Sequence, residues 1–586
     1  MTFKITALKH LLVQSILFFS IYVNAQSRIL IDGLYDDWVD YPLYTDTSND
    51  GGSSGIDFGK IQVSNDHEFI FFYVEVGTNI NLQDLNDVAI YLDIDNKAST
   101  GVSTSGIGAD LIYTFGDRSG NYNGSIIRHA DIGLITAPTI TSDRFEIAIK
   151  RTFSPNGNNV SIGNSIRIIF KDNSSNGDIA PSTNGGITYT MSEEQQLPLP
   201  SYSFDKPANS DLRIISYNVE RDGFFASNRE SSYKRILQAV QPDIIGFQEI
   251  YDNTSKQIAD RVESMLPSGS GEQWYYAGAE PDCHAISRYP ILKSSKIEGS
   301  GGSGNGAFLI NIPDSENDML LVVAHPPCCT NNTGRQIEVD LIMKFIRDAK
   351  DGKGPIPIEE GSPIMIVGDM NFVGDAAQLK TLLTGDIANE TSYGPDFSPD
   401  RNGSNLLDSK LPTTGLPFSY TWYSESSSFS PGKLDYILYS GSNLTLNNAY
   451  TLFTPGLSQE NLNANRLQSN DVLIASDHLP VIADFTLKNK AVNSIGKLDD
   501  ILIGLHITPN PSYGTTNITF NNPKNTIVSI QLINLNGKSI STIYDGRLTS
   551  GEQVIPLDAA VYPAGSYILK LVTPDAIYYK KISVIH

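Results

Sequence analysis

A set of polar side chains in the middle of the chain lies at the ends of apolar runs of the kind that form buried strands. These side chains are Asn218, Glu249, His325, Asp369, Asn371, Asp435, Asp477 and His478. An acidic or imidazole group at the end of an apolar strand is costly to bury unless it is paired or binds an ion. Carboxylate and amide oxygens suit a hard divalent cation, and imidazoles can transfer protons near neutral pH. The residue types therefore indicate divalent-metal and phosphate chemistry.

The elements that must position these side chains alternate between strands and helices. Strands are expected at residues 212–219, 244–248, 320–324 and 364–367, and helices at 230–240, 255–266 and 335–349. The helices carry apolar residues on one face, and the strands are short apolar runs. This alternation predicts an α/β domain over residues 211–487, with its site at the ends of the strands.

The flanking regions have a different pattern. Residues 26–190 contain period-two runs without a helical period between them, which predicts a β-sandwich, and residues 505–586 predict a second, smaller one. Polar stretches at 191–210 and 488–504 are expected to be linkers. Residues 1–25 have the charged start, short apolar stretch and small residues of a secretory signal peptide. No other apolar run is long enough to span a membrane, so we expect a mature, exported and monomeric protein without a span.

Composition restricts the classes of protein further. The 586 residues include 42 Lys and Arg against 65 Asp and Glu, which gives a formal net charge of -23, and only 3 Cys. These numbers exclude a cationic sheath for polyanions, a disulfide scaffold and a repeated zinc module. Long-range attraction to DNA should be weak, although a local metal site could still bind phosphate.

The blocks around the polar residues resemble those of the endonuclease/exonuclease/phosphatase (DNase I-like) superfamily. The resemblance rests on several blocks in the family's order: Ile215-Ser216-Tyr217-Asn218, Phe247-Gln248-Glu249, Gly368-Asp369-Met370-Asn371 and Ser476-Asp477-His478. Each block alone is a weak signal, whereas the ordered set is specific. The resemblance implies a four-layer α/β sandwich with one site at the sheet edges, and metal-assisted, in-line hydrolysis of a phosphoester.

The same resemblance implies a role for each residue. Glu249 corresponds to the principal ligand of Mg²⁺ or Mn²⁺, with Asn218 and Asp477 completing the metal shell. Asp369 and Asn371 correspond to residues that orient the attacking water and hold a phosphate oxygen. His478 with Asp435 corresponds to an acid/base dyad, and His325 to a second histidine that donates to a non-bridging oxygen.

The chain departs from the family pattern around its cysteines. The strand that usually reads Gly-Asn-Ala-Ile-Leu-Ser-Arg is here residues 282–288, beginning Asp282-Cys283-His284, so the partner of His325 is either Asp282 or Glu280. His325 is followed by Pro326-Pro327-Cys328-Cys329. In an exported protein we expect a disulfide from Cys283 to Cys328 or Cys329, with a vicinal Cys328–Cys329 bridge as the rival and a soft-metal site including His284 third. Arg335, beyond this loop, is expected on a helix surface.

Two further resemblances concern the flanking sandwiches. The first sandwich resembles carbohydrate-binding family 9 modules in the blocks Ile31-Asp32-Gly33, Asp36-Asp37-Trp38 and Asp93-Ile94-Asp95-Asn96. This resemblance implies a surface glycan as partner and a Ca²⁺ ion held by Asp93, Asp95 and Asp110. The alternative is that the sandwich is a spacer. Trp38 is expected to anchor the core. The second sandwich resembles the C-terminal sorting domain of the type IX secretion system in four blocks: Pro509-Asn510-Pro511, Asn536-Gly537-Lys538, residues 563–567 and Lys580-Lys581. That resemblance implies contact with the secretion machinery and a location outside the cell or on its surface.

Three functions are consistent with these observations. The first is a secreted endonuclease that hydrolyses phosphodiester bonds of extracellular nucleic acid. The second keeps the chemistry but acts on a phospholipid head group or small phosphodiester, like a sphingomyelinase. The third, from another class, is a catalytically silent glycan-binding surface protein. The N-terminal sandwich supports it, whereas the presence of every metal and histidine position counts against it, because a decayed enzyme usually loses some.

Overall fold

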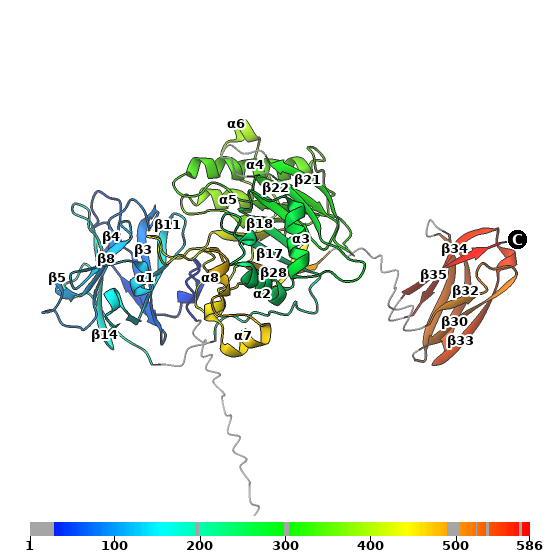
Figure 1. Ribbon diagram of the computed structural model, residues 1–586, viewed down its shortest axis with the longest axis horizontal. Coiled ribbons are helices and arrows are strands. Elements are labelled where there is room, and N and C mark those ends of the chain that lie inside the picture. The colour runs from blue at the N-terminus through cyan, green and yellow to red at the C-terminus, as the bar shows by residue number, and fades with distance from the viewer. Residues whose placement is uncertain are drawn as a thin grey trace, which may run out of the picture. The chain divides into compact units, whose positions relative to one another are not determined.

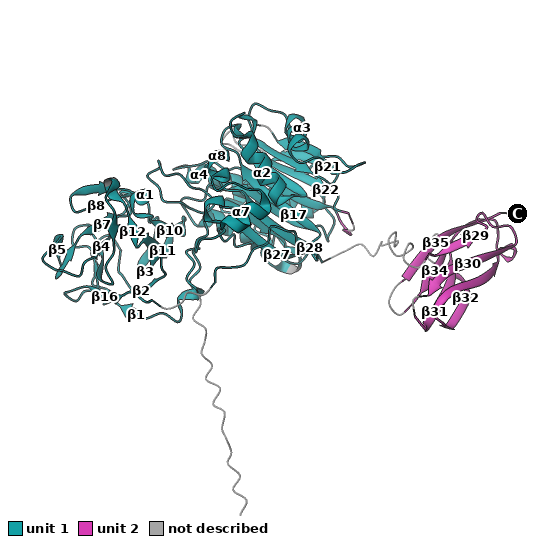
Figure 2. Cartoon of the chain, turned by 60° about the horizontal axis from the view of Figure 1, so that its bottom comes forward, with its two compact units in different colours: residues 1–312, 318–488 teal, residues 313–317, 489–586 magenta. Residues whose placement is uncertain are grey.

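The computed structural model describes residues 28–193, 198–279, 281–297, 304–313, 315–488, 504–522, 524–534, 538–573 and 577–585 (Figure 1). Contacts divide the chain into two compact units, residues 1–312 with 318–488 and residues 313–317 with 489–586 (Figure 2). The predicted signal peptide lies outside the described residues. Among the described helices, none combines the length and the apolar character that crossing a membrane requires.

The first part of the chain forms a β-sandwich. Its elements are η1 (Asp36–Trp38), β1 (Leu43–Thr45), β2 (Lys60–Asn65), β3 (Phe69–Ile80), β4 (Val88–Asp93), β5 (Val102–Thr104), β6 (Ile107–Ala109), β7 (Leu111–Thr114), β8 (Ser119–Tyr122), β9 (Ser125–Ile127), α1 (His129–Ile132), β10 (Ile135–Ala137), β11 (Ser142–Lys150), β12 (Thr152–Phe153), η2 (Pro155–Gly157), β13 (Val160–Ser161), β14 (Ser165–Asp172), β15 (Ile179–Ala180) and β16 (Ile187–Thr190).

Two antiparallel sheets enclose the core of this sandwich. One has the strand order β1-β2-β3-β11-β10, and the other β15-β14-β4-β7-β8-β9 with β16 beside β14. Phe72 and Phe145 from the first sheet pack with Ile90 and Phe170 from the second, as period-two strands require. Trp38 is buried, as expected for a core anchor, and donates its indole N–H to Glu146 Oε1 at 2.7 Å.

The second part of the same unit is the α/β domain. Its elements are β17 (Leu212–Asn218), η3 (Gly223–Phe225), α2 (Glu230–Val240), β18 (Ile244–Gln248), α3 (Ser255–Met265), β19 (Tyr275–Ala279), β20 (Cys283–Ser287), β21 (Ile291–Ile297), β22 (Asn305–Ile310), β23 (Met319–Ala324), α4 (Asn332–Lys350), β24 (Ile364–Asp369), α5 (Ala377–Thr384), α6 (Glu390–Tyr393), η4 (Arg401–Gly403), β25 (Leu407–Asp408), β26 (Asp435–Tyr439), β27 (Leu444–Thr451), η5 (Thr454–Gly456), α7 (Gln459–Asn465), α8 (Asp471–Ala475) and β28 (Val481–Leu487).

Two mixed sheets lie face to face in this domain, and helices cover their outer faces. The strand orders are β19-β20-β18-β17-β28-β27 and β21-β22-β23-β24-β26-β25. Alternate residues of one strand serve different layers: Ile214 packs between the sheets, whereas Ile215 packs beneath α2 and α3. On the second sheet, Leu321 faces inward and Val322 packs beneath α4. The result is the expected four-layer sandwich.

The stretch predicted to be the first linker packs on the α/β domain where the structure describes it. The aromatic rings of Tyr202 and Phe204 lie 5.5 Å and 5.8 Å from that of Tyr450, between centroids. Lys206 forms an ion pair with Asp243 at 2.7 Å. Residues 198–210 are therefore packed against the surface of the α/β domain.

The second unit is a small β-sandwich. Its elements are β29 (His506–Thr508), β30 (Thr515–Asn522), β31 (Thr526–Ile533), β32 (Ser539–Leu548), β33 (Gly551–Asp558), η6 (Ala559–Val561), β34 (Gly565–Val572) and β35 (Ile577–Val584). The sheets have the orders β29-β30-β33 and β32-β31-β34-β35. Ile518, Ile530 and Leu569 lie in the core between them.

Candidate active site

Strand register brings the polar residues to one edge of the two sheets. β17 runs parallel to β18 with Asn218 opposite Gln248, so that Glu249 follows immediately. β23 runs parallel to β24 with Ala324 opposite Gly368, so His325 and Asp369 are neighbours. β26 is antiparallel to β24 and begins at Asp435, opposite Asp369.

Asn218 joins the two acidic groups on either side of it. Its Nδ2 donates to Glu249 Oε1 and to Asp369 Oδ2, each at 3.0 Å, while its Oδ1 accepts from the backbone of Glu220 at 3.0 Å. Glu249 Oε2 accepts from the backbone N–H of Arg221 at 2.9 Å. Glu249 has a φ of 62°, a left-handed conformation that is costly for a residue with a side chain.

His478 and Asp435 form a buried pair. His478 Nδ1 lies 2.9 Å from Asp435 Oδ2, and the backbone N–H of Asp435 donates to Thr421 Oγ1 at 2.8 Å. Burial alone would lower the pKa of His478, but the charges of Asp435 and Asp369 and the hydrogen bond to Asp435 outweigh it and raise that pKa to about 10. The carboxylate thus fixes the ring and favours the imidazolium.

His325 forms a second pair, with Asp282. His325 Nδ1 lies 2.5 Å from Asp282 Oδ2, and Asp282 Oδ1 accepts from the backbone of Gly304 at 2.9 Å. Burial lowers the pKa of His325, yet the Asp282 hydrogen bond and the charges of Asp369, Asp282 and Glu249 raise it to about 9. The choice left open by the sequence falls on Asp282; Glu280 lies outside the described residues.

Two buried residues that the sequence analysis missed support the backbone of His325. Asn305 Oδ1 accepts from the His325 N–H at 2.9 Å, and Asn305 Nδ2 donates to Glu338 Oε2 at 2.8 Å. Both side chains are fully buried. The signal was present, because a Glu on the inner face of a helix and an Asn at the start of an apolar strand both require partners.

Asp369 lies between the two histidines. Its Oδ2 is 3.6 Å from His325 Nε2 and 3.5 Å from His478 Nε2. Burial raises the pKa of Asp369 to about 6, with His478 opposing that rise and Asp435 adding to it. Asn371, with a φ of 50°, donates its backbone N–H to Asp369 Oδ1 at 2.9 Å and its Nδ2 to the carbonyl of Pro326 at 3.0 Å.

Asp477 is held apart from these contacts. Its Oδ2 accepts the indole N–H of Trp422 at 3.1 Å, and its carbonyl accepts from the backbone of Tyr423 at 3.0 Å. Trp422 is partly exposed. In the described part of the α/β domain, the clusters of acidic and histidine groups with ligand atoms within 4.8 Å of one another are Glu249–His325–Asp369 and Asp369–Asp435–His478. Asp477 as a metal ligand stays a prediction.

The cysteines are paired differently from the first expectation. Cys328 is bonded to Cys329, and Cys283 is a buried free thiol, so the bridge expected from Cys283 is not formed. The reason is that Cys283 faces the core between the sheets, whereas Cys328 and Cys329 are exposed on the loop beyond His325. The vicinal bridge also removes the two thiolates that a soft-metal site would need.

Arg335 is fully buried, contrary to the helix-surface position expected for it. Its Nη1 donates to the carbonyls of Pro327 and Cys329 at 2.8 Å and 3.0 Å, and its Nη2 to Asn332 Oδ1 at 2.7 Å. The guanidinium therefore anchors the loop that carries the disulfide, with Asn371 holding the other end at Pro326.

The predicted calcium ligands of the first sandwich lie together. Asp93, Asp95 and Asp110 each offer an oxygen within 4.8 Å of the others. Backbone N–H groups already satisfy some of these oxygens, since Lys97 donates to Asp93 at 2.9 Å and Ile94 to Asp110 at 3.0 Å. Calcium binding here stays a prediction.

The donor set of the main cluster fits a hard divalent cation. Glu249 is the partly exposed carboxylate, and Asp369 is the buried one that shares the Asn218 amide with it. Oxygen donors without a thiolate are the ligands that Mg²⁺ and Mn²⁺ prefer.

Comparison with known families agrees with this geometry. Residues 215–478 match the sequence model of the Endonuclease/Exonuclease/phosphatase family, and residues 506–585 match that of the secretion system C-terminal sorting domain. An uncharacterized Caenorhabditis elegans protein is 22% identical over 193 residues, which is 29% of this chain and 57% of that protein's length.

Solved structures that are similar to this chain include three different proteins. The human Nocturnin catalytic domain with bound sulfate is 18% identical, covers 47% of this chain and 94% of its own, and has a TM-score of 0.30. ANGEL2, a 2',3'-cyclic phosphatase, in complex with adenosine-2',3'-vanadate is 18% identical; the match covers 50% of this chain and 100% of ANGEL2, with a TM-score of 0.32. Sphingomyelinase C from Streptomyces griseocarneus is 16% identical; the match covers 47% of this chain and 98% of the sphingomyelinase, with a TM-score of 0.29.

The family match and the site together define the central domain. Residues 215–478 have the fold of the metal-dependent phosphoesterase family with a buried site of acidic and histidine residues, and the match of residues 506–585 to the sorting domain indicates secretion to the cell surface or the extracellular space.

Proposed function

We propose that this chain is a secreted nuclease that hydrolyses phosphodiester bonds of nucleic acid with Mg²⁺ or Mn²⁺. The observation that carries the chemistry is the convergence of two histidine–carboxylate pairs on Asp369, with Glu249 and Asn218 beside them. Every predicted proton-transfer residue is present, which argues against the catalytically silent alternative.

Glu249 is the residue that would hold the cation, with Asn218 fixing the direction of its carboxylate. Bound there, the cation supplies positive charge that neutralises a phosphate oxygen and polarises phosphorus. Asp369, buried and within reach of both imidazoles, would orient and deprotonate the attacking water. Asn371 holds Asp369 in place through its backbone N–H.

The two imidazoles act on the oxygens of the phosphate. With pKa values raised to about 9 and about 10, His325 and His478 both carry a proton at neutral pH. Each has its Nδ1 against a carboxylate, so each presents Nε2–H to the site. Such donors stabilise the charge that develops on the non-bridging and leaving oxygens.

A cation and an aromatic ring beside Glu249 favour nucleic acid as the substrate. Tyr251 is 41% exposed and Arg221 is exposed. The backbone N–H of Arg221 donates to Glu249 Oε2 at 2.9 Å, and Tyr251 follows Glu249 by two residues, so both side chains start beside Glu249. An exposed arginine can contact a neighbouring phosphate, and an exposed tyrosine can stack on a base.

The test compares substrates and rim variants of the full chain in Mg²⁺. Arg221→Ala and Tyr251→Ala should each raise KM for single-stranded DNA about tenfold, the cost of one lost stacking or phosphate contact, and leave hydrolysis of bis(p-nitrophenyl) phosphate unchanged. Lys256→Ala, on the exposed face of α3, is the matched control. Turnover of sphingomyelin vesicles with no cleavage of DNA or RNA would replace this proposal with the lipid alternative.

A further inference from the structure

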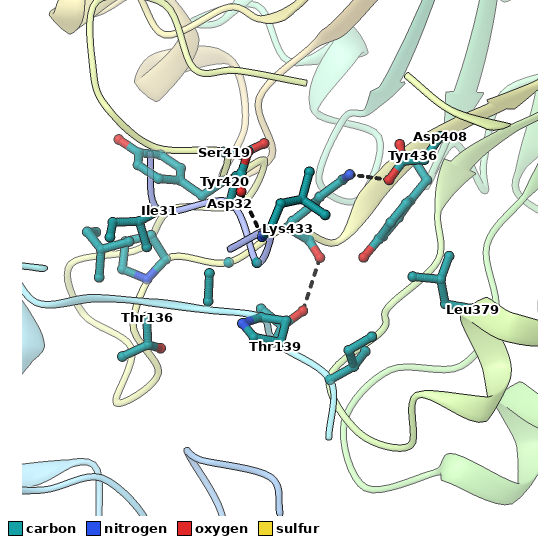
Figure 3. A pocket seen from close by; sticks show the side chains of 18 residues that line it. Ile31, Asp32, Thr136, Thr139, Leu379, Asp408, Ser419, Tyr420, Lys433 and Tyr436 are labelled. Carbon is teal, nitrogen blue, oxygen red and sulfur yellow. Dashed lines mark hydrogen bonds and ion pairs between the residues drawn. The ribbon is translucent and has the colours of Figure 1, made fainter. Parts of the chain in front are cut away.

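The turn between β10 and β11 of the first sandwich contacts the α/β domain directly. Thr139 Oγ1 donates to the carbonyl of Phe372 at 2.7 Å and lies 3.3 Å from that of Lys433. Two residues on, the Thr141 N–H donates to the carbonyl of Gly374 at 2.8 Å, and Thr141 Oγ1 accepts from the backbone of Ala376 at 3.0 Å. Figure 3 shows Thr139 and Lys433 on opposite sides of this junction.

A second group of contacts comes from the segment after β3 and from β10 of the sandwich. Asn81 Nδ2 donates to the carbonyl of Val373 at 2.8 Å, and Gln83 Oε1 accepts from the Ser430 N–H at 2.8 Å. Thr136 Oγ1 lies 3.0 Å from Ser430 Oγ, and both residues are buried. Several segments of the sandwich therefore form hydrogen bonds with the same two stretches of the α/β domain, residues 372–376 and 430–433.

Those two stretches adjoin the segments that hold the catalytic carboxylates Asp369 and Asp435. Residues 372–376 begin immediately after Asn371, and residues 430–433 end just before Asp435. Strand pairing holds the two together as far as Asp369 opposite Asp435, followed by one backbone bond from Met370 to Leu434 at 2.8 Å. Beyond that bond, the Thr139 hydroxyl reaches both loops at once.

The packing at this point is close. A Cβ atom at Gly432 would lie 2.5 Å from Thr139 Cγ2, so a larger residue there would have to displace the Thr139 side chain. The cavity at the junction, about 130 Å³, is lined from both sides by residues that include Ile31, Thr136 and Tyr436. Tyr436 follows the catalytic Asp435 directly, and the Lys433 ammonium lies 4.5 Å from the centre of its ring.

We propose that the first sandwich is a positioning element of the active site, and that Thr139 is a positioning residue which sets the distance between the loops of Asp369 and Asp435. This inference rests on the proposed phosphoesterase chemistry. Because a buried carbonyl that loses its donor must move to find another, loss of the hydroxyl should displace both loops. Asp369 Oδ2 lies 3.5 Å from His478 Nε2. A small change in this distance should lower kcat more than it changes KM, because it disturbs the alignment of the reacting groups and not the binding of substrate.

The test uses the full chain and paired substitutions. Thr139→Val removes the hydroxyl at nearly constant volume, and Thr139→Ser restores it. With bis(p-nitrophenyl) phosphate and Mg²⁺, Thr139→Val should lower kcat about tenfold with KM within about twofold, and Thr139→Ser should regain most of the loss. Thr188→Val, on an exposed strand position of the same sandwich, is the control and should match the wild type.

A second measurement keeps the inference separate from the proposed chemistry. Hydrogen exchange of the intact chain should show faster exchange in residues 370–376 and 430–435 for Thr139→Val than for Thr188→Val, whether or not the assay substrate is hydrolysed. Unchanged exchange there, or a folded Thr139→Val enzyme with wild-type kcat, would overturn the inference. Faster exchange in a protein without activity would support the positioning contact and count against the phosphoesterase proposal.

Discussion

Replacing Asp282 by Asn tests the role of the second histidine pair. Asp282 makes the 2.5 Å hydrogen bond to His325, and that bond is the strongest of the influences that raise the pKa of His325 from 6.5 to about 9. A difference of that size corresponds to about 3 kcal/mol in favour of the imidazolium. Without the carboxylate, burial is opposed only by the charges of Asp369 and Glu249, so the pKa of His325 falls toward its ordinary value.

The magnitude follows from the fraction of protonated imidazole. At pH 7.5 a histidine with a pKa near 6.5 is about one-tenth protonated, against nearly complete protonation in the wild type. Misorientation of the ring should add a similar factor, so kcat should fall about hundredfold. Because the imidazolium form returns as pH falls, the loss relative to wild type should be about sixtyfold smaller at pH 6 than at pH 8.5.

The assay is the pH dependence of kcat for bis(p-nitrophenyl) phosphate in saturating Mg²⁺. Asp260→Asn, at an exposed position of α3, is the matched control and should follow the wild type at each pH. A kcat within threefold of wild type for Asp282→Asn, or an equal loss at pH 6 and pH 8.5, would refute the reasoning that protonated His325 donates to the phosphate.

Three further predictions follow from other parts of the structure. Arg213→Met should destabilise the protein by about 3–5 kcal/mol in urea unfolding, because it leaves the buried carboxylate of Asp484, now bound at 2.6 Å, without its partner; a loss below 1 kcal/mol would contradict this. Thiol labelling should find no reactive cysteine in the native protein and one after unfolding, namely Cys283; two or more would contradict the loop disulfide. Mg²⁺ should raise the Tm of the wild type but not that of Glu249→Gln, because the neutral side chain lacks the charge of the metal ligand. Equal shifts of Tm in the two proteins would show that the cation binds elsewhere.

Local patterns in the sequence predicted the elements well where apolar periodicity is strong. The helix expected at 230–240 and the strand at 244–248 coincide with α2 and β18. The helix expected from 335 begins three residues earlier, because the Asn331 side chain caps it by accepting from Gly334 N–H at 2.9 Å. A polar first turn carries no periodicity, but Asn at this position was a readable cap.

Contacts between distant segments could not be predicted in the same way. The choice between Asp282 and Glu280 depends on where the chain turns after β19, and the cysteine pairing depends on the inward direction of Cys283. Arg335 is buried because carbonyls of a loop six to eight residues earlier fold back over it. The contact of Thr139 with the catalytic loops joins residues more than 200 positions apart, which no local pattern records.

The most direct test of the central claim is cleavage of supercoiled plasmid DNA by the full chain in Mg²⁺, beside His478→Asn and an EDTA-treated sample. The account predicts nicking by the wild type that EDTA abolishes and that His478→Asn reduces at least hundredfold. Intact plasmid after incubation with the folded wild type and Mg²⁺, or equal cleavage by His478→Asn, would contradict it.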